Sequence, residues 1–146
     1  MSIPSETDRP SRTLITTAAV LLSSTRVLLP VLGWDVTRRI VEPVAAIAPP
    51  FRQVEPHAIA TAVEVVHRRA PFSPTCLMKA IVGKALLEAN DHRVELKLGV
   101  ARKQGEFHAH AWIERDGSVL IGELEDLSEY RTLTDRDSDR RLQSLF

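Results

Sequence analysis

Hydrophobic positions in the first half of the chain recur at intervals that predict helices. Leu14 to Leu32 is the most apolar stretch, and we expect it to form a buried or partner-facing helix. Val36 to Ala48 continues as a second helical piece that Pro43 bends or divides. After a loop, apolar residues at helical spacing predict a third helix from Pro56 to about Arg69.

The next expected helix begins close to the cysteine of the chain. Ser73 is typical of an N-cap and Pro74 of a first helical residue, so Cys76 should lie in the first turn. Unpaired N–H groups and the positive end of the helix dipole lower the pKa of a thiol at such a place. The helix is expected to continue to about Asp91, with Lys79 facing outward.

Alternating hydrophobic and polar residues predict three antiparallel strands in the second half. They are expected at Val94 to Ala101, Phe107 to Glu114 and Val119 to Leu124. Residues 125–146 are highly charged and predict a peripheral strand or helix with a solvated end. Helices followed by an antiparallel sheet indicate an α+β fold. We expect a flexible tail at residues 1–12 and a single domain at 13–146.

The Asp116-Gly117 dipeptide sets the register between the second and third expected strands. It favours a two-residue type I′ turn, in which both residues have positive φ. Counting back from a regular turn places His110 directly opposite Glu123. The Cβ atoms of such a pair lie about 5 Å apart, so the carboxylate can orient the imidazole.

Composition and charge argue against several classes of function. The chain of 146 residues has 19 basic and 19 acidic residues, and its arginine pairs are scattered, so we expect no nucleic-acid partner. One cysteine cannot form an internal disulfide. Polar residues and Pro30 interrupt the apolar stretch near the N-terminus, so we expect no membrane span, no signal peptide and a cytoplasmic protein.

A helix-start cysteine, then a strand histidine, then an acid on the next strand is the order of a papain-like triad. In this interpretation Cys76 attacks a carbonyl carbon, His110 takes and returns the proton, and Glu123 fixes the imidazole tautomer. Backbone N–H groups at the helix start would bind the oxyanion. This chemistry needs no cofactor or metal. His108 lies on the same face as His110 and is a second candidate base.

A different interpretation uses both histidines as metal ligands. His108 and His110 share one face of the expected strand, and with Glu114 they resemble the first metal motif of cupins. No histidine follows residue 122 to complete a second motif, and about half of the chain is expected to be helical. These features favour the peptidase interpretation over a cupin-like metal protein.

Several sequence motifs resemble the transglutaminase-like B proteins of lasso-peptide biosynthesis. The resemblance covers about residues 60–125 and consists of Cys76-Leu77, Leu86-Leu87, Leu98-Gly99-Val100, His110-Ala111-Trp112-Ile113-Glu114 and Asp116-Gly117. It implies a papain/transglutaminase-like fold and a cysteine peptidase that removes the leader from a ribosomally made precursor peptide. By position, Cys76 matches the nucleophile and His110 the base. The family usually has Asp where this chain has Glu123, and Asp126 is the reserve candidate.

The same resemblance implies partners. They are the precursor peptide, with its leader and core, and an ATP-dependent cyclase that closes the macrolactam. Some members carry a fused winged-helix recognition module, whose strands are missing from the N-terminal part of this sequence. We therefore expect the split form, in which a separate recognition protein delivers the precursor. Because Glu123 replaces the usual Asp, an inactive partner that only presents the precursor is the remaining alternative.

Overall fold

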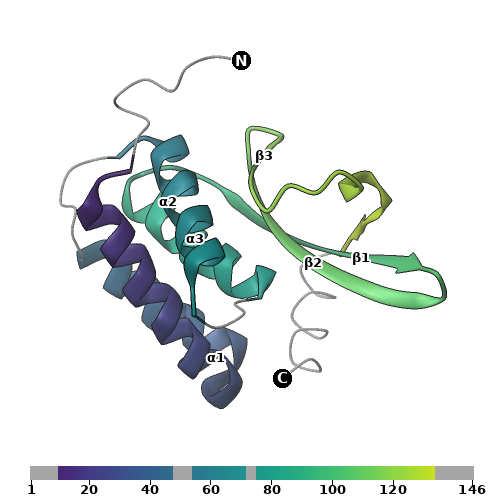
Figure 1. The fold of residues 1–146 in the computed structure, drawn as a ribbon, viewed down its shortest axis with the longest axis horizontal. Helices are drawn as coiled ribbons and strands as arrows, with labels where there is room; N and C mark the ends of the chain where they lie inside the picture. The colour runs from purple at the N-terminus through teal and green to yellow at the C-terminus, as the bar shows by residue number, and fades with distance from the viewer. Residues whose placement is uncertain (1–9, 48–53, 72–74, 134–146) are drawn as a thin grey trace.

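Helices precede an antiparallel sheet in the computed structural model, which describes residues 10–47, 54–71 and 75–133 (Figure 1). The helices are α1 (Arg12–Ile47), α2 (Pro56–Arg69) and α3 (Cys76–Ala89), and the strands are β1 (Glu95–Lys103), β2 (Glu106–Arg115), β3 (Ser118–Ile121) and β4 (Arg131–Thr132). A short 3₁₀ helix, Leu127–Glu129, lies before β4. The strand order is β3-β2-β1-β4. The predicted α+β fold is confirmed, whereas most of the expected tail and residues 134–146 lie outside the described residues.

Gly33 divides α1 into two helical parts. Its φ of 79° and ψ of 175° are not helical, and a positive φ of this size favours glycine over residues with a Cβ. The two predicted helical pieces, Leu14 to Leu32 and Val36 to Ala48, lie on either side of this break. Pro43, predicted to bend or divide the second piece, lies within it, and its φ and ψ are helical.

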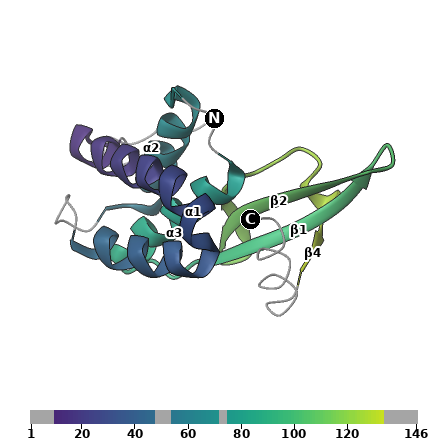
Figure 2. The ribbon, with the colours of Figure 1, turned by 90° about the horizontal axis from the view of Figure 1, so that it is seen from below.

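The segment Arg12–Gly33 is long and apolar enough to cross a membrane, by length and composition alone. The polar residues of this segment led us to expect no membrane span. Its length and apolar composition, however, do not exclude one. In the fold, 39% of the apolar window is buried. Leu14, Leu22 and Leu29 lie in the hydrophobic core, and α1 packs against both α2 and α3 (Figure 2).

Helix α2 has the predicted bounds, but α3 begins later than predicted. Thr75 is its N-cap, and the Thr75 hydroxyl accepts a hydrogen bond from the Met78 N–H at 3.2 Å. Ser73 and Pro74, the predicted cap and first helical residue, lie outside the described residues. Cys76 is the first residue of α3, so its predicted place in the first turn is confirmed.

Strands β1 and β2 form a long hairpin that places His110 near the middle of the sheet. Gly99 of β1 pairs with His110 of β2. The far end of this hairpin projects beyond the helices (Figure 1), and β4 lies along the outer side of β1 (Figure 2). Ala111 and Ile113 belong to the core cluster shared with the helices. Because side chains alternate across a strand, His110 and Trp112 lie on the opposite face.

The β2–β3 hairpin has a different register from the one predicted. Asp116 (φ 51°) and Gly117 (φ 81°) form the expected turn with two positive φ angles. A β-bulge then makes Ile113 pair with Ile121 rather than with Leu120. Strand β3 ends at Ile121, so the predicted cross-strand pairing of His110 with Glu123 is wrong.

The bulge has a physical reason in the packing of Ile121 on α3. A regular register would pair Ile121 with Trp112, on the face away from the helices. The extra residue brings Ile121 to the core side, where it is 1% exposed. A Cβ on Gly83 of α3 would lie only 2.5 Å from Ile121 Cδ1, so the missing side chain of this glycine makes room for the isoleucine.

Candidate active site

Helix α3 and strand β2 bring Cys76 and His110 together. Cys76 is half-buried at the first position of α3, and His110 is 8% exposed within β2. A hydrogen bond joins the thiol and the imidazole, and it shifts the pKa of both groups. The residues expected to act as nucleophile and base are therefore direct neighbours.

A backbone carbonyl fixes the other side of the imidazole. Nε2 of His110 lies 2.6 Å from the carbonyl oxygen of Gly122. Because a carbonyl oxygen can only accept, Nε2 must carry a hydrogen and donate it. In the neutral ring Nδ1 then has the free lone pair, which is the arrangement a general base needs to take a proton from a thiol.

The surroundings of Cys76 favour the thiolate. Burial raises the pKa of the thiol, but four effects oppose burial. They are the hydrogen bond with His110, the backbone N–H groups of Ala111 and Leu77, and the positive charge of the imidazolium. Together these effects lower the pKa of Cys76 below the ordinary value for a cysteine.

The surroundings of His110 favour the imidazolium. The hydrogen bond with Cys76 raises the pKa of His110, and burial acts in the opposite direction. The Gly122 carbonyl and the charge of the thiolate raise this pKa further, while the charge of Lys79 lowers it, and the net direction is upward. A thiolate and an imidazolium therefore stabilise each other across a range of pH.

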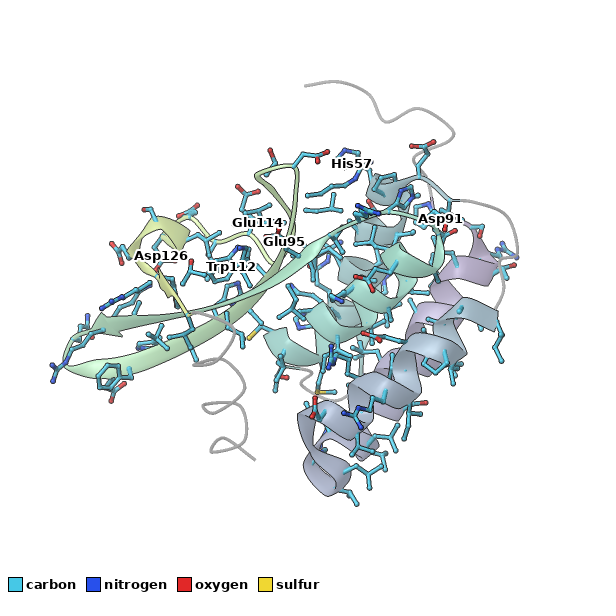
Figure 3. All side chains as sticks on the ribbon, turned by 180° about the vertical axis from the view of Figure 1, so that it is seen from behind. His57, Asp91, Glu95, Trp112, Glu114 and Asp126 are labelled. Atoms are coloured by element: carbon cyan, nitrogen blue, oxygen red, sulfur yellow. The ribbon has the colours of Figure 1, made fainter. Side chains whose placement is uncertain are left out.

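Two aromatic residues hold the imidazole in place. The ring of Trp112 stacks on His110 with centroids 6.0 Å apart and planes 16° apart, and the Tyr130 ring lies 5.8 Å away at 57°. Nε1 of Trp112 donates to Oε1 of Glu114 at 2.9 Å, and both residues are labelled along β2 in Figure 3. A Cβ on Gly99 would lie 2.8 Å from the Trp112 ring, so the glycine lets the indole lie flat on β1.

The acidic residues predicted for the third position lie elsewhere. Glu123 follows the end of β3 and its side chain is exposed. Asp126 lies on the segment that precedes β4 (Figure 3), and its carboxylate forms an ion pair with Lys103 of β1. The acceptor for the Nε2 hydrogen of His110 is instead the Gly122 carbonyl.

The two-histidine metal interpretation finds no support in the geometry. His108 is exposed on the projecting part of β2, whereas His110 is buried. Within residues 10–47, 54–71 and 75–133, no group of three His, Cys, Asp or Glu side chains is arranged to hold a metal ion. The four-stranded sheet is also not the barrel that a cupin-like site requires.

Sequence reasoning missed two charged residues beside the site. Lys79, predicted to face outward, is 8% exposed, and its Nζ lies 3.2 Å from both carboxylate oxygens of Glu64. The spacing of Cys76 and Lys79 could have revealed the lysine, because residues three apart share one side of a helix. Glu64 lies on α2, and no local pattern links it to Cys76.

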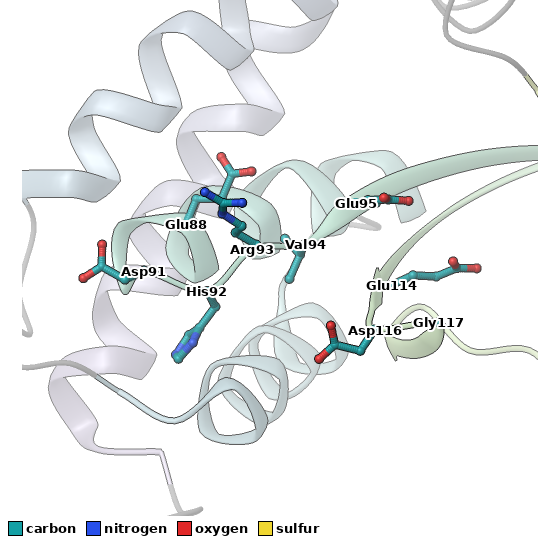
Figure 4. A pocket seen from close by; sticks show the side chains of 9 residues that line it. All are labelled: Glu88, Asp91, His92, Arg93, Val94, Glu95, Glu114, Asp116 and Gly117. Carbon is teal, nitrogen blue, oxygen red and sulfur yellow. The ribbon is translucent and has the colours of Figure 1, made fainter.

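A depression of about 860 Å³ lies at the other end of α3 (Figure 4). It is lined by Glu88, Asp91, His92, Arg93, Val94, Glu95, Glu114, Asp116 and Gly117. Cys76 and Glu88 lie near opposite ends of α3, and at 1.5 Å per residue they are separated by about 18 Å. The depression is therefore separate from the Cys76–His110 pair.

Comparison with known proteins agrees with this arrangement. A family profile described as the Transglutaminase-like superfamily matches residues 19–135, which include all of α2, α3 and the sheet. No curated protein and no solved structure matches the chain. The matched domain typically has a cysteine protease fold. The chain therefore belongs to the transglutaminase-like superfamily.

Proposed function

We propose that this protein is a cysteine peptidase that removes the leader from a ribosomally synthesised lasso-peptide precursor before macrolactam cyclisation. The observation that carries the peptidase assignment is the hydrogen-bonded Cys76–His110 pair, in which the pKa of the thiol is lowered and the pKa of the imidazole is raised. Superfamily membership supports a cysteine-peptidase-like enzyme. The motifs shared with lasso-peptide B proteins support the choice of substrate.

The first half of the proposed reaction forms a thioester. The Cys76 thiolate attacks the carbonyl carbon of the scissile amide, and the oxygen of that carbonyl takes the negative charge. Helix-start N–H groups, which have no carbonyl partner within the helix, stabilise this oxyanion. The C–N bond then breaks as the His110 imidazolium gives its proton to the leaving amine.

The second half releases the leader by hydrolysis. Neutral His110 takes a proton from water, and the resulting hydroxide attacks the thioester carbon. The C–S bond breaks, the Cys76 thiolate leaves, and the leader departs with a new carboxyl end. The proton held by His110 restores the starting ion pair, so no oxidant, reductant or cofactor is consumed.

The proposed setting follows from the same resemblance. The enzyme acts in the cytoplasm on a precursor that a separate recognition protein delivers, and it passes the core to an ATP-dependent cyclase. No nucleic acid or membrane takes part. The domain proposed to be responsible spans residues 13–146.

A non-catalytic role in presenting the precursor is the second candidate. The feature that favours it is the position of Glu123, which lies after β3 with an exposed side chain. A presenting protein needs no reactive thiol. Dependence of leader release on Cys76 therefore separates the two functions.

The test is mass spectrometry of the purified protein after incubation with the precursor and recognition protein encoded beside it. Wild type is expected to release the leader, and Cys76→Ala and His110→Ala are expected not to. His108→Ala is the matched control, because His108 is an exposed histidine on the same strand. Leader release by Cys76→Ala at the wild-type rate would contradict the proposal.

A further inference from the structure

A partly buried ion pair lies beside the candidate active site and has no role in the proposed chemical steps. Lys79 lies one turn after Cys76 on α3, and its side chain is 10% exposed. Its Nζ contacts both Oε1 and Oε2 of Glu64 at 3.2 Å. Taking an ammonium group out of water is costly unless a partner compensates its charge, so the position of this pair calls for an explanation.

Glu64 connects this ion pair to the residue that holds the imidazole. Oε1 of Glu64 accepts from the backbone N–H of Gly122 at 3.4 Å. The carbonyl oxygen of the same Gly122 accepts from Nε2 of His110 at 2.6 Å. A continuous path of contacts therefore runs from Lys79 through Glu64 and Gly122 to His110.

Gly122 needs such an anchor because the sheet does not supply one. Strand β3 ends at Ile121, so ladder hydrogen bonds no longer fix the backbone at the next residue. Gly122 has a φ of 87°, a left-handed conformation in which glycine has the most freedom. The carboxylate of Glu64 ties this residue to α2, and α3 holds the carboxylate through Lys79.

We propose that Glu64 and Lys79 are positioning residues for His110. They hold the Gly122 backbone in place, so that its carbonyl can fix the orientation of the His110 imidazole. In a catalytic triad a carboxylate fixes this orientation by direct contact with the histidine. This inference rests on the Cys76–His110 pair of the proposed function. It is tested without a peptide substrate, so that failure of the leader-peptidase proposal would not affect the outcome.

The ion pair also sets the charge around His110. The charged and titratable groups that face the imidazole are Cys76 and Lys79 from α3, Glu64 through Gly122 from α2, and Tyr130 from the segment before β4. The Lys79 ammonium disfavours the imidazolium, and the Glu64 carboxylate compensates this charge. Neutralising Glu64 and neutralising Lys79 should therefore shift the pKa of His110 in opposite directions.

The first experiment is an NMR titration of the His110 ring in the whole protein. Glu64→Gln leaves the Lys79 charge uncompensated, so the pKa of His110 should fall by about one pH unit. Lys79→Met leaves the carboxylate, so the same pKa should rise. Glu125→Gln, which neutralises an exposed glutamate after β3, is the matched control and should leave the titration unchanged.

The second experiment separates positioning from charge by using two variants with an uncharged pair. Glu64→Gln/Lys79→Met keeps an oxygen that can accept from the Gly122 N–H, and Glu64→Ala/Lys79→Met does not. Cys76 is the single cysteine of the chain, so alkylation by iodoacetamide reports on it alone. At neutral pH the second double variant should alkylate about tenfold more slowly than the first, because without the oxygen the imidazole is less well positioned.

The outcomes separate the proposal from a merely structural role. Opposite shifts of the His110 pKa in the single variants, together with slow alkylation only in the variant that lacks the oxygen, support it. Shifts of the same sign, no shift, or equal alkylation rates in the two double variants overturn it. If a single variant does not fold because a charge is left unpaired, the comparison of the two uncharged double variants decides.

Discussion

Contacts with four single residues hold the imidazole of His110. Cys76 forms a hydrogen bond with it, the Gly122 carbonyl accepts a hydrogen bond from Nε2, and the rings of Trp112 and Tyr130 lie against it. Each contact restricts a different motion of the ring. The tautomer is fixed by a backbone oxygen, which has no pKa of its own in the accessible range and so keeps this role as the pH changes.

Gly122→Ala is expected to disturb the active site through the backbone. An alanine at φ 87° is strained by about 1–2 kcal/mol, and its Cβ would lie 3.0 Å from the Ala111 oxygen. The carbonyl that holds His110 should move, and the pKa of Cys76 should rise. We expect slower alkylation of Cys76 at neutral pH and a lower midpoint in urea unfolding.

Gly105→Ala is the control for this prediction. Gly105 has a similar φ of 83°, but nothing lies within 4 Å of its Cβ position, and it lies at the tip of the β1–β2 hairpin. The Gly105→Ala variant should be less stable because its backbone is strained, but Cys76 should be alkylated at the wild-type rate. Equal alkylation rates in the two glycine variants would show that Gly122 has no special role.

At the scale of elements, the start of α3 creates the environment of Cys76, the proposed nucleophile. Thr75 caps the helix by accepting from the Met78 N–H, and Cys76 follows directly. The cap fixes the first turn, whose N–H groups lower the pKa of the thiol and are available to an oxyanion. A nucleophile placed later in the helix would lose both effects.

Thr75→Ala is expected to lower the free energy of unfolding by about 1 kcal/mol, because the cap hydrogen bond is lost. Thr75→Ser keeps a hydroxyl at the cap and should remain close to wild type. Thr61→Ala, at an exposed threonine within α2, is a control for the loss of a side chain. Urea unfolding of the three variants gives the comparison, and an equal loss in Thr75→Ala and Thr75→Ser would contradict the capping role.

Local patterns explain which elements could be predicted from sequence. Pro56 at a helix start and apolar residues at helical spacing were enough to give the bounds of α2. The Asp116-Gly117 turn was also predicted correctly, because its positive φ angles follow from the two residue types. These features depend on neighbours in the sequence, so the sequence contains the information for them.

Long-range packing explains what could not be predicted. The β-bulge arises where Ile121 packs on Gly83 of α3, a contact between residues far apart in the chain. One inserted residue reverses the face of every later side chain, so the expected pairing of His110 with Glu123 failed. Cys76 and His110 could be paired from sequence because their residue types and their positions within elements suggest the pairing. Glu64, by contrast, comes close to them only because α2 packs on α3.

At the scale of the whole molecule, the candidate active site lies between two layers that must stay packed together. The helices supply Cys76, Lys79 and Glu64, and the sheet and its following segment supply His110 and Gly122. Ile113 and Ile121 join the layers as members of the core cluster. Loosening this contact would separate Cys76 from His110.

Ile113→Ala is expected to lower the free energy of unfolding by about 2–5 kcal/mol, the usual cost of a large cavity in a core. Ile113 is 0% exposed, whereas Phe107 on the same strand is 74% exposed. Phe107→Ala should therefore change the stability by no more than about 0.5 kcal/mol. Urea unfolding measures both, and similar losses would show that the contact between the layers is not a main source of stability.

The pH dependence of Cys76 alkylation by iodoacetamide tests most directly the claim that Cys76 and His110 form an activated pair. The rate follows the thiolate fraction, so a lowered pKa in wild type places half-maximal alkylation below the ordinary cysteine value of about 8.5. In His110→Ala the effect of burial is no longer opposed by the imidazole, and the curve should move to higher pH, while His108→Ala should follow wild type. A His110→Ala curve that coincides with wild type would contradict the account.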